Sequence, residues 1–170
     1  DFLDEVLTNH PELDVVQLQI NYLDWENESI QSRKCYEVSR KHHKPIIVME
    51  PIKGGTLAQL PTEAENLLRT FSPENTPVSW ALRFAASHDG VLTVLSGMNT
   101  VEQVMENTQL MKDFKPMGDD EKRLLMKVAE IITSSGGIPC TNCRYCTETC
   151  PKNIAIPDYF ALYQEGNFST

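Results

Sequence analysis

Three short apolar runs, separated by segments with helical spacing, mark the amino-terminal part of the chain. They cover Leu13–Ile20, Ile46–Met49 and Val91–Leu95. Their length and largely continuous apolar character predict buried strands, of the kind found in parallel sheets covered on both faces. Strands that alternate with helices are typical of a parallel α/β sheet. This part of the chain therefore predicts an α/β fold.

Helices are predicted where apolar residues recur at three- and four-residue spacing and capping signals accompany them. Thr76 followed by Pro77 marks one helix start, and Thr100 with Gln103 fits a capping box at another. A short helix is expected near Glu63–Arg69, inside an otherwise irregular stretch. The other predicted helices cover residues 2–7, 29–43, 100–111 and 119–134, and Ile156-Pro157 is predicted to start a short helix around residues 159–165.

The pattern changes after Pro116, and this change divides the chain into two predicted units. Residues 1–116 hold the alternation of strands and helices. Residues 117–170 are predicted to be helical and contain the cysteine-rich loop. We therefore expect an α/β part followed by a small helical extension.

Four of the five cysteines lie in one short stretch with the spacing C-x₂-C-x₂-C-x₃-C-P. This is the spacing of bacterial ferredoxins, in which cysteine thiolates hold a [4Fe–4S] cluster. A structural zinc site is the alternative, although such sites usually set two cysteine pairs some distance apart. The predicted metal ligands are Cys140, Cys143, Cys146 and Cys150.

The sequence does not decide which residue is the fourth ligand of the cluster. In ferredoxins with two clusters, the cysteine before the proline serves the other cluster. Only Cys35 remains outside the motif, so this chain cannot complete a second cluster. Either Cys150 closes a single cluster, or Cys35 or a non-cysteine group does so. The helical pattern around Cys35 favours a buried structural role for it.

The composition of the chain limits the kinds of binding partner and the cell compartment that we expect. A net charge of −9 argues against a nucleic-acid partner, which requires a basic surface. No apolar run approaches the length of a membrane span, so no membrane partner is expected. Clustered free cysteines fit a reducing compartment, and we expect a cytoplasmic location. The chain begins with Asp1, and we expect it to be the carboxyl-terminal part of a longer protein.

Polar residues at the strand ends are candidates for ligand binding. Gln17 and Gln19 lie within the first predicted strand, and a buried amide needs partners. One of them is therefore expected to satisfy neighbouring groups or to contact a ligand. Gly54 and Gly55 follow the second strand directly, where backbone amides can approach a phosphate. A plain flexible turn is the alternative for the glycine pair.

Three segments resemble successive motifs of the aldo/keto reductases. They are Leu18–Asp24, Val48–Leu57 and Leu95–Asn107, which occur in the order of that family and at strand ends. With the cysteine loop, they resemble the branch that carries a ferredoxin-like carboxyl-terminal extension. The resemblance implies a (β/α)₈ barrel of the TIM type, with its site at the carboxyl face of the strands. This chain would supply the last three strand–helix units and a small helical iron–sulfur extension.

The resemblance also implies roles at a nicotinamide cofactor, NAD(P)(H). Gln17 matches the residue that holds the nicotinamide carboxamide, and Met49 stands where many members stack an aromatic ring. Gly97 and Gln103 stand where many NADPH-dependent members have Lys and Arg, so this segment does not support a preference for NADPH. The residues matched to cofactor binding are Gln17, Met49, Glu50, Pro51, Lys53, Gly54, Gly55, Ser96, Gly97, Asn99, Gln103, Glu106 and Asn107.

The catalytic Asp, Tyr, Lys and His of the family come from the first half of the barrel, and nothing in this chain matches their motifs. We therefore assign no catalytic residue and expect this chain alone to be inactive. Three strands of a barrel also leave two open edges, and open edges pair with other strands. The isolated chain is accordingly expected to self-associate.

Two functions are compatible with these observations. The first is an NAD(P)-dependent aldo/keto reductase-like oxidoreductase that acts on a small carbonyl or alcohol and carries a [4Fe–4S] cluster for electron transfer with a redox partner protein. The second is a non-catalytic iron–sulfur or zinc module with a structural or docking role. Metal and sulfide content would distinguish them.

Overall fold

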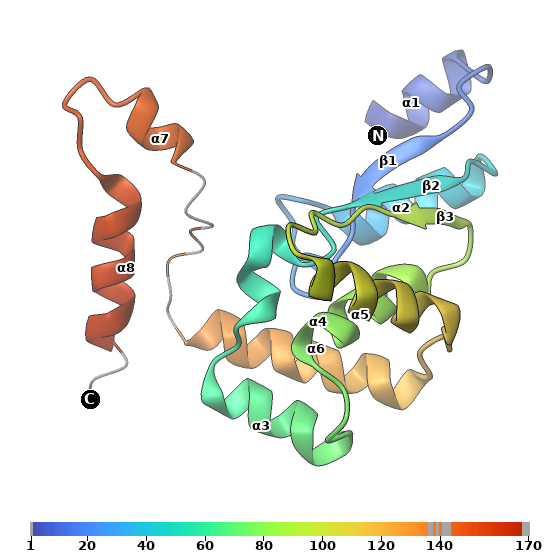
Figure 1. Cartoon of the computed structure of the whole chain (residues 1–170). Helices are drawn as coiled ribbons and strands as arrows, with labels where there is room; N and C mark the ends of the chain where they lie inside the picture. The colour runs from blue at the N-terminus through green and yellow to red at the C-terminus, as the bar shows by residue number, and fades with distance from the viewer. Residues whose placement is uncertain (1, 136–137, 139, 141–143, 168–170) are drawn as a thin grey trace.

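The centre of the computed structural model is a parallel sheet of three strands in the order β1-β2-β3 (Figure 1). The structure describes residues 2–135, 138, 140 and 144–167. In register, Val16 pairs with Ile46, and Ile46 pairs with Val91. The predicted parallel α/β fold is therefore confirmed. The strands are β1 Val16–Gln19, β2 Ile46–Met49 and β3 Val91–Val94.

The strand predictions are confirmed, with differences at the ends. The bounds of β2 are those predicted from sequence, because Pro45 precedes it and a sharp turn follows it. The first strand begins at Val16 rather than Leu13, and both Leu13 and Val15 are 41% exposed. A register shift after Ile46 skips Leu92 on β3, as in a β-bulge.

Helices surround the sheet and connect its strands. The predicted helix near Glu63–Arg69 is longer than expected, because Pro61 sets its start and Glu63 and Glu65 favour its first turn. Directly after β2 the chain forms a short 3₁₀ segment, which the sequence pattern did not predict. The helices are α1 Phe2–Asn9, α2 Ser32–Lys41, η1 Lys53–Ala58, α3 Thr62–Phe71, α4 Pro77–Ala86, α5 Val101–Lys112, α6 Asp119–Ser134, α7 Tyr145–Glu148 and α8 Ile156–Asn167.

One apolar core joins the sheet to the helices α3, α4 and α6, which lie together below the sheet in the view of Figure 1. Trp80 and Phe84 of α4 are buried against Tyr22 and Val48 from the strand side. Leu124, Leu125 and Val128 of α6 belong to the same core cluster. Helix α6 thus shares a core with the sheet, although it follows the predicted boundary at residue 116.

Helix α5 contributes no buried residue to this core. Its Val101 and Met105 are 69% and 66% exposed. Within the described part of the chain, β1 and β3 each have a neighbouring strand on one side only. Open strand edges and an uncovered apolar helix fit a sheet that continues in a larger barrel. The expected self-association of the isolated chain stays a prediction.

The carboxyl-terminal extension contains two helices that contact each other. Arg144, before α7, forms an ion pair with Asp158 of α8 at 3.0 Å. Helix α8 starts at Ile156, as the sequence predicted, and continues to Asn167. None of the helices that the structure describes combines the length and the apolar character needed to cross a membrane.

Candidate functional site

The carboxyl ends of the strands meet at one edge of the sheet, because all three strands run in the same direction. The segments that leave this edge are residues 20–31 after β1, residues 50–58 after β2 and residues 95–100 after β3. In parallel α/β folds, ligands bind at this edge. This edge of the sheet is therefore where a ligand site is expected.

A cavity of about 710 Å³ lies between the segments that follow β2 and β3. All the residues predicted for cofactor binding line it, except Gln17 and Lys53. They come from the turn after β2, from the loop after β3 and from the first turns of α5. Five residues outside that matched set also line it: Ile52, Ala58, Val78, Leu95 and Met98.

The wall of the cavity after β2 is a turn with unusual backbone geometry. Glu50, Lys53, Gly54 and Gly55 all have positive φ, at 53°, 47°, 58° and 97°. Such conformations favour glycine, which has no Cβ to clash with the backbone. Nothing lies within 4 Å of the position a Cβ would take on Gly55, so its φ rather than lack of space requires glycine there. A turn of this kind lets backbone amides come close to an anionic group.

The opposite wall is the loop Ser96–Asn99 and the start of α5. A capping box has two hydrogen bonds, one to the side chain of the capping residue and one to its N–H. The first is confirmed, because the Thr100 hydroxyl accepts a hydrogen bond from the Gln103 N–H at 3.3 Å. The second hydrogen bond differs from the prediction, because Gln103 Oε1 accepts from the N–H of Asn99, at 2.9 Å, rather than from that of Thr100. Asn107 Nδ2 donates to Ser96 Oγ at 3.2 Å. These bonds fix the loop to the helix.

Gln17 and Lys53 lie beside this cavity rather than in its lining. Gln17 Nε2 donates to the Met49 sulfur at 3.2 Å, and Met49 lines the cavity. Gln17 thus reaches the edge of the cavity through Met49. The Lys53 side chain turns to the other side of its loop and forms an ion pair with Asp24.

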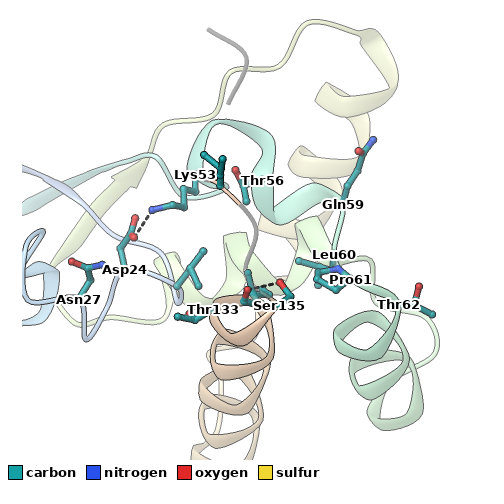
Figure 2. A pocket seen from close by; sticks show the side chains of 13 residues that line it. Asp24, Asn27, Lys53, Thr56, Gln59, Leu60, Pro61, Thr62, Thr133 and Ser135 are labelled. Carbon is teal, nitrogen blue, oxygen red and sulfur yellow. Dashed lines mark hydrogen bonds and ion pairs between the residues drawn. The ribbon is translucent and has the colours of Figure 1, made fainter. Parts of the chain in front are cut away.

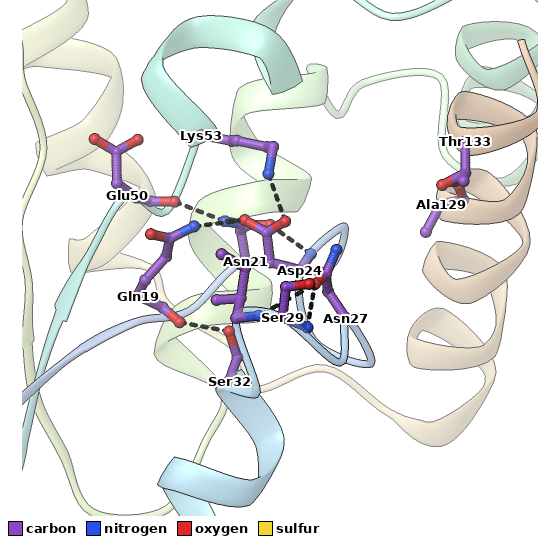
Figure 3. A network of polar contacts seen from close by, with 11 residues as sticks. Gln19, Asn21, Asp24, Asn27, Ser29, Ser32, Glu50, Lys53, Ala129 and Thr133 are labelled. Carbon is purple, nitrogen blue, oxygen red and sulfur yellow. Dashed lines mark hydrogen bonds and ion pairs between the residues drawn. The ribbon is translucent and has the colours of Figure 1, made fainter. Parts of the chain in front are cut away.

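Asp24 is the centre of a buried polar network, shown in Figure 3. Its carboxylate accepts hydrogen bonds from Gln19 Nε2 at 2.7 Å, from Asn21 Nδ2 at 2.9 Å and from the Lys53 ammonium group. Asn21 Nδ2 also donates to the Glu50 carbonyl at 3.1 Å. The network therefore joins the loop after β1 to the turn after β2. It also confirms that a strand glutamine, Gln19, satisfies neighbouring groups.

The charge of Asp24 is stabilised despite its burial. Burial opposes ionisation, but the hydrogen bonds from Lys53, Asn21 and Gln19 outweigh it and hold the pKa of Asp24 below its usual value. Asp24 is thus a buried carboxylate that stays ionised. The sequence placed Asp24 in a recognisable motif, yet its partners come from separate segments that no local pattern connects.

A second cavity, of about 580 Å³, lies on the far side of the Asp24–Lys53 pair (Figure 2). Thr56 and Gln59 line one side of it, and Thr133 and Ser135 at the end of α6 line another. Because α6 is distant in sequence from the strand-end loops, no sequence pattern predicted this cavity.

The structure describes three of the four motif cysteines, and Cys143 lies outside the described residues. Cys146 lies in α7 and is exposed, whereas Cys140 and Cys150 are half-buried. The Ile154 N–H donates to Cys150 Sγ at 3.5 Å, and hydrogen bonds from this and neighbouring backbone amides lower the pKa of the Cys150 thiol. Among the residues described, no three His, Cys, Asp or Glu side chains are grouped to hold a metal ion.

The parallel sheet, with helices between its strands, defines the class as an α/β protein, and its cavity lies at the carboxyl ends of the strands. A family model described as "Aldo/keto reductase family" matches residues 3–129. The chain belongs to the aldo/keto reductase family, which is a family of oxidoreductases. No curated protein matches the chain.

Solved structures show the same fold. The holo form of aldo-keto reductase AKR11C1 from Bacillus halodurans is 21% identical, with a TM-score of 0.56. The match covers 74% of this chain and 46% of that one. The apo form of the same protein is 18% identical, with a TM-score of 0.56 and coverage of 74% and 47%. The chain therefore spans a little under half the length of these structures and matches part of their barrel.

Proposed function

We propose that the full-length protein is an oxidoreductase that binds NAD(P)(H) in the cavity between the segments after β2 and β3. The observation that carries this proposal is the shared lining of that cavity. The glycine turn after β2 and the segment Ser96–Asn107 are far apart in sequence and face one space of about 710 Å³. Both segments were matched to cofactor binding by sequence alone.

The chemistry of the lining fits a dinucleotide. The turn at Glu50–Gly55 brings its backbone to the wall of the cavity, where a pyrophosphate would lie, and Ser96, Asn99 and Asn107 offer polar groups to a ribose or a base. Met49 and Gln17 lie together at the end of the cavity nearest β1, where they would contact a nicotinamide carboxamide. When bound, the nicotinamide supplies or accepts a hydride. These residues of the chain bind and orient it.

The described lining of this cavity offers none of the side chains that this proposal would use to protonate a carbonyl oxygen. Among the described residues that line the cavity there is no Tyr, Lys or His. The proton donor would come from the remaining part of the barrel. We propose a small carbonyl or alcohol as substrate, because a hydride from nicotinamide reduces a carbonyl when an acid protonates the oxygen.

We further propose that Cys140, Cys143, Cys146 and Cys150 hold one [4Fe–4S] cluster. The spacing of the four cysteines supports this, and so does the lowered pKa of Cys150, because thiolates are the ligands of iron–sulfur clusters. When bound, such a cluster carries single electrons. A hydride carries two, so exchange with the nicotinamide would require a flavin or a partner protein between them.

Turnover of the full-length protein, purified without oxygen, tests the nicotinamide proposal. We expect oxidation of added NADH or NADPH that depends on a carbonyl compound chosen from a panel of small aldehydes and ketones. Cofactor binding would be followed separately by quenching of nicotinamide fluorescence. The absence of both binding and turnover would refute the proposal.

Metal and acid-labile sulfide analysis tests the cluster proposal. We expect iron and sulfide in similar amounts, and their loss in Cys146→Ser and Cys150→Ser. Cys35→Ser is the matched control, because Cys35 lies in α2 and outside the motif. Loss of the cluster in Cys35→Ser would identify Cys35 as a ligand instead.

A structural module remains the second candidate for the extension. The contact between α7 and α8 and the ion pair between Arg144 and Asp158 favour it, since they hold the cysteine segment against α8. Zinc without sulfide in the purified protein would support this function and exclude electron transfer by the extension.

A further inference from the structure

A third cavity, of about 490 Å³, shares no lining residue with the two cavities described above. It lies where the loop after β1, helix α2, the end of α4 and the first half of α6 meet. Pockets that bind small molecules commonly measure about 300 to 1,000 Å³ and combine apolar walls with a few polar groups. This cavity is therefore a candidate for a ligand other than the dinucleotide.

Four rings line the cavity and hold one another in place. The ring centroids of Trp25 and His88 are 4.4 Å apart, and those of Trp25 and Tyr36 are 5.6 Å apart. Phe84 is buried, with its ring centroid 4.8 Å from that of His88. The other three side chains are half-buried. They present a fixed aromatic surface against which a further ring can pack favourably.

His88 adds one hydrogen-bond acceptor to this surface. Its Nδ1 lies 2.8 Å from the Phe84 carbonyl, so Nδ1 carries the proton and donates it. Burial lowers the pKa of His88 more than the bond to Phe84 raises it, and the ring is therefore neutral at neutral pH. In a neutral ring with a protonated Nδ1, Nε2 is an acceptor. It forms no hydrogen bond with any residue that the structure describes.

Two charged side chains at the cavity lack partners within the described part of the chain. Glu26 and Arg123 also line the cavity, but each forms an ion pair with a neighbouring residue. Asp89 and Lys122 form none with a described residue. Their charges shift the pKa of His88 in opposite directions, so both lie near its ring. The cavity thus offers a carboxylate and an ammonium group beside an aromatic surface.

We propose that this cavity binds a free aromatic amino acid, and that tryptophan fits it best. The ligand ring packs against Trp25 and Tyr36, and the indole N–H donates to Nε2 of His88. Asp89 accepts hydrogen bonds from the amino group, and Lys122 donates to the carboxylate. A ligand with a single charge leaves one of these two side chains without a partner, so a zwitterion fits better.

Calorimetry on the full-length protein with L-tryptophan and three analogues tests the proposal. Tryptamine lacks the carboxylate, indolepropionate lacks the amino group, and L-alanine lacks the ring. We expect L-tryptophan to bind with a Kd of about 0.1 to 1 mM, which suits a ligand of its size. Tryptamine and indolepropionate should bind about threefold to fivefold more weakly, because partly exposed ion pairs contribute modestly. L-alanine should show no binding.

Two variants assign the contacts with the charged groups. Lys122→Met should bind L-tryptophan and tryptamine about equally, because the contact with the carboxylate is lost. Asp89→Asn should likewise bind L-tryptophan and indolepropionate about equally, because the ion pair with the amino group is lost. Lys127→Met is the matched control. Lys127 is an exposed residue of α6 that does not line the cavity, so the wild-type preferences should persist within about twofold.

The proposal fails if the wild-type protein does not bind L-tryptophan, or binds tryptamine and indolepropionate equally well. Unchanged preferences in both Lys122→Met and Asp89→Asn would also overturn it, because the amino acid would then bind elsewhere on the protein.

This site is independent of the proposed nicotinamide site, because the two cavities share no lining residue. Saturating NADH should therefore leave the Kd for L-tryptophan within about twofold. Displacement of L-tryptophan by NADH would place the amino acid in the nicotinamide cavity and overturn the proposal. Binding of L-tryptophan without binding of NADH would support the proposal and count against the proposed function alone.

Discussion

At the scale of single residues, Asp24 connects the loops that form the candidate site. It accepts hydrogen bonds from Gln19, Asn21 and Lys53, and Asn21 also holds the Glu50 carbonyl. Glu50 begins the turn that lines the larger cavity and has a positive φ. The network therefore supports a backbone conformation that would be unfavourable in an isolated peptide.

Loss of the Lys53 ammonium group should destabilise the protein strongly. Lys53→Met leaves the Asp24 carboxylate, 1% exposed, without its cation, and we expect a loss of about 3 kcal/mol in the free energy of unfolding. Asp24→Asn should cost less, because Lys53 is partly exposed and can still reach water. Urea denaturation at neutral pH measures both. Lys127→Met, an exposed lysine of α6, is the control and should change stability by less than about 0.5 kcal/mol.

The pH dependence of the same variants gives an independent readout. The folded-state pKa of Asp24 is lowered, so its contribution is fully present above the unfolded value of about 3.9 and is lost as pH falls through the folded value. Wild-type protein should therefore lose stability on acidification below about pH 4. The Lys53→Met variant should lose less stability over that range, because without the lysine the pKa of Asp24 is lowered less. Equal acid dependence in the two proteins would contradict the importance of this ion pair.

At the scale of helices and strands, α4 carries the largest fully buried side chain, Trp80, and has a well-defined start. The Thr76 hydroxyl accepts from the Ser79 N–H at 3.1 Å, and Pro77 occupies the first turn. Thr76→Ala removes this cap, and we expect a loss of about 1 kcal/mol in stability, whereas Thr76→Ser should retain most of it. Thr70→Ala, at an exposed position in α3, is the matched control. Denaturant unfolding that does not distinguish Thr76→Ala from Thr70→Ala would contradict the capping role.

Local signals predicted most of these elements, because each signal acts over a few residues. Pro45 and the glycine turn bound β2 on both sides, and Thr76 with Pro77 starts α4. Helix α3 was predicted too short, although Pro61 before it and Arg69 in its last turn are boundary signals. The capping box predicted that the Gln103 side chain accepts from the Thr100 N–H, whereas it accepts from the Asn99 N–H. The choice between these two adjacent N–H groups depends on the conformation of the loop before α5.

At the scale of the whole molecule, the chain matches one part of an aldo/keto reductase barrel. The family match and the fold agree on an aldo/keto reductase barrel, and the chain spans 46% of the holo structure it resembles. Most of the residues matched to the cofactor, with the exception of Gln17 and Lys53, line one cavity because parallel strands bring their carboxyl ends together. The second cavity could not be predicted, since it forms only where the end of α6 meets the strand-end loops.

Hydrogen exchange of the full-length protein with and without NADH tests the central claim most directly, because it locates the bound cofactor on the chain. We expect slower exchange in residues 49–58 and 95–108, which contain nearly all the residues that line the larger cavity, and no change at residues 131–135 beside the second cavity. Fluorescence quenching in the same sample confirms that the cofactor is bound. Bound NADH that leaves exchange in 49–58 and 95–108 unchanged would contradict the proposed site.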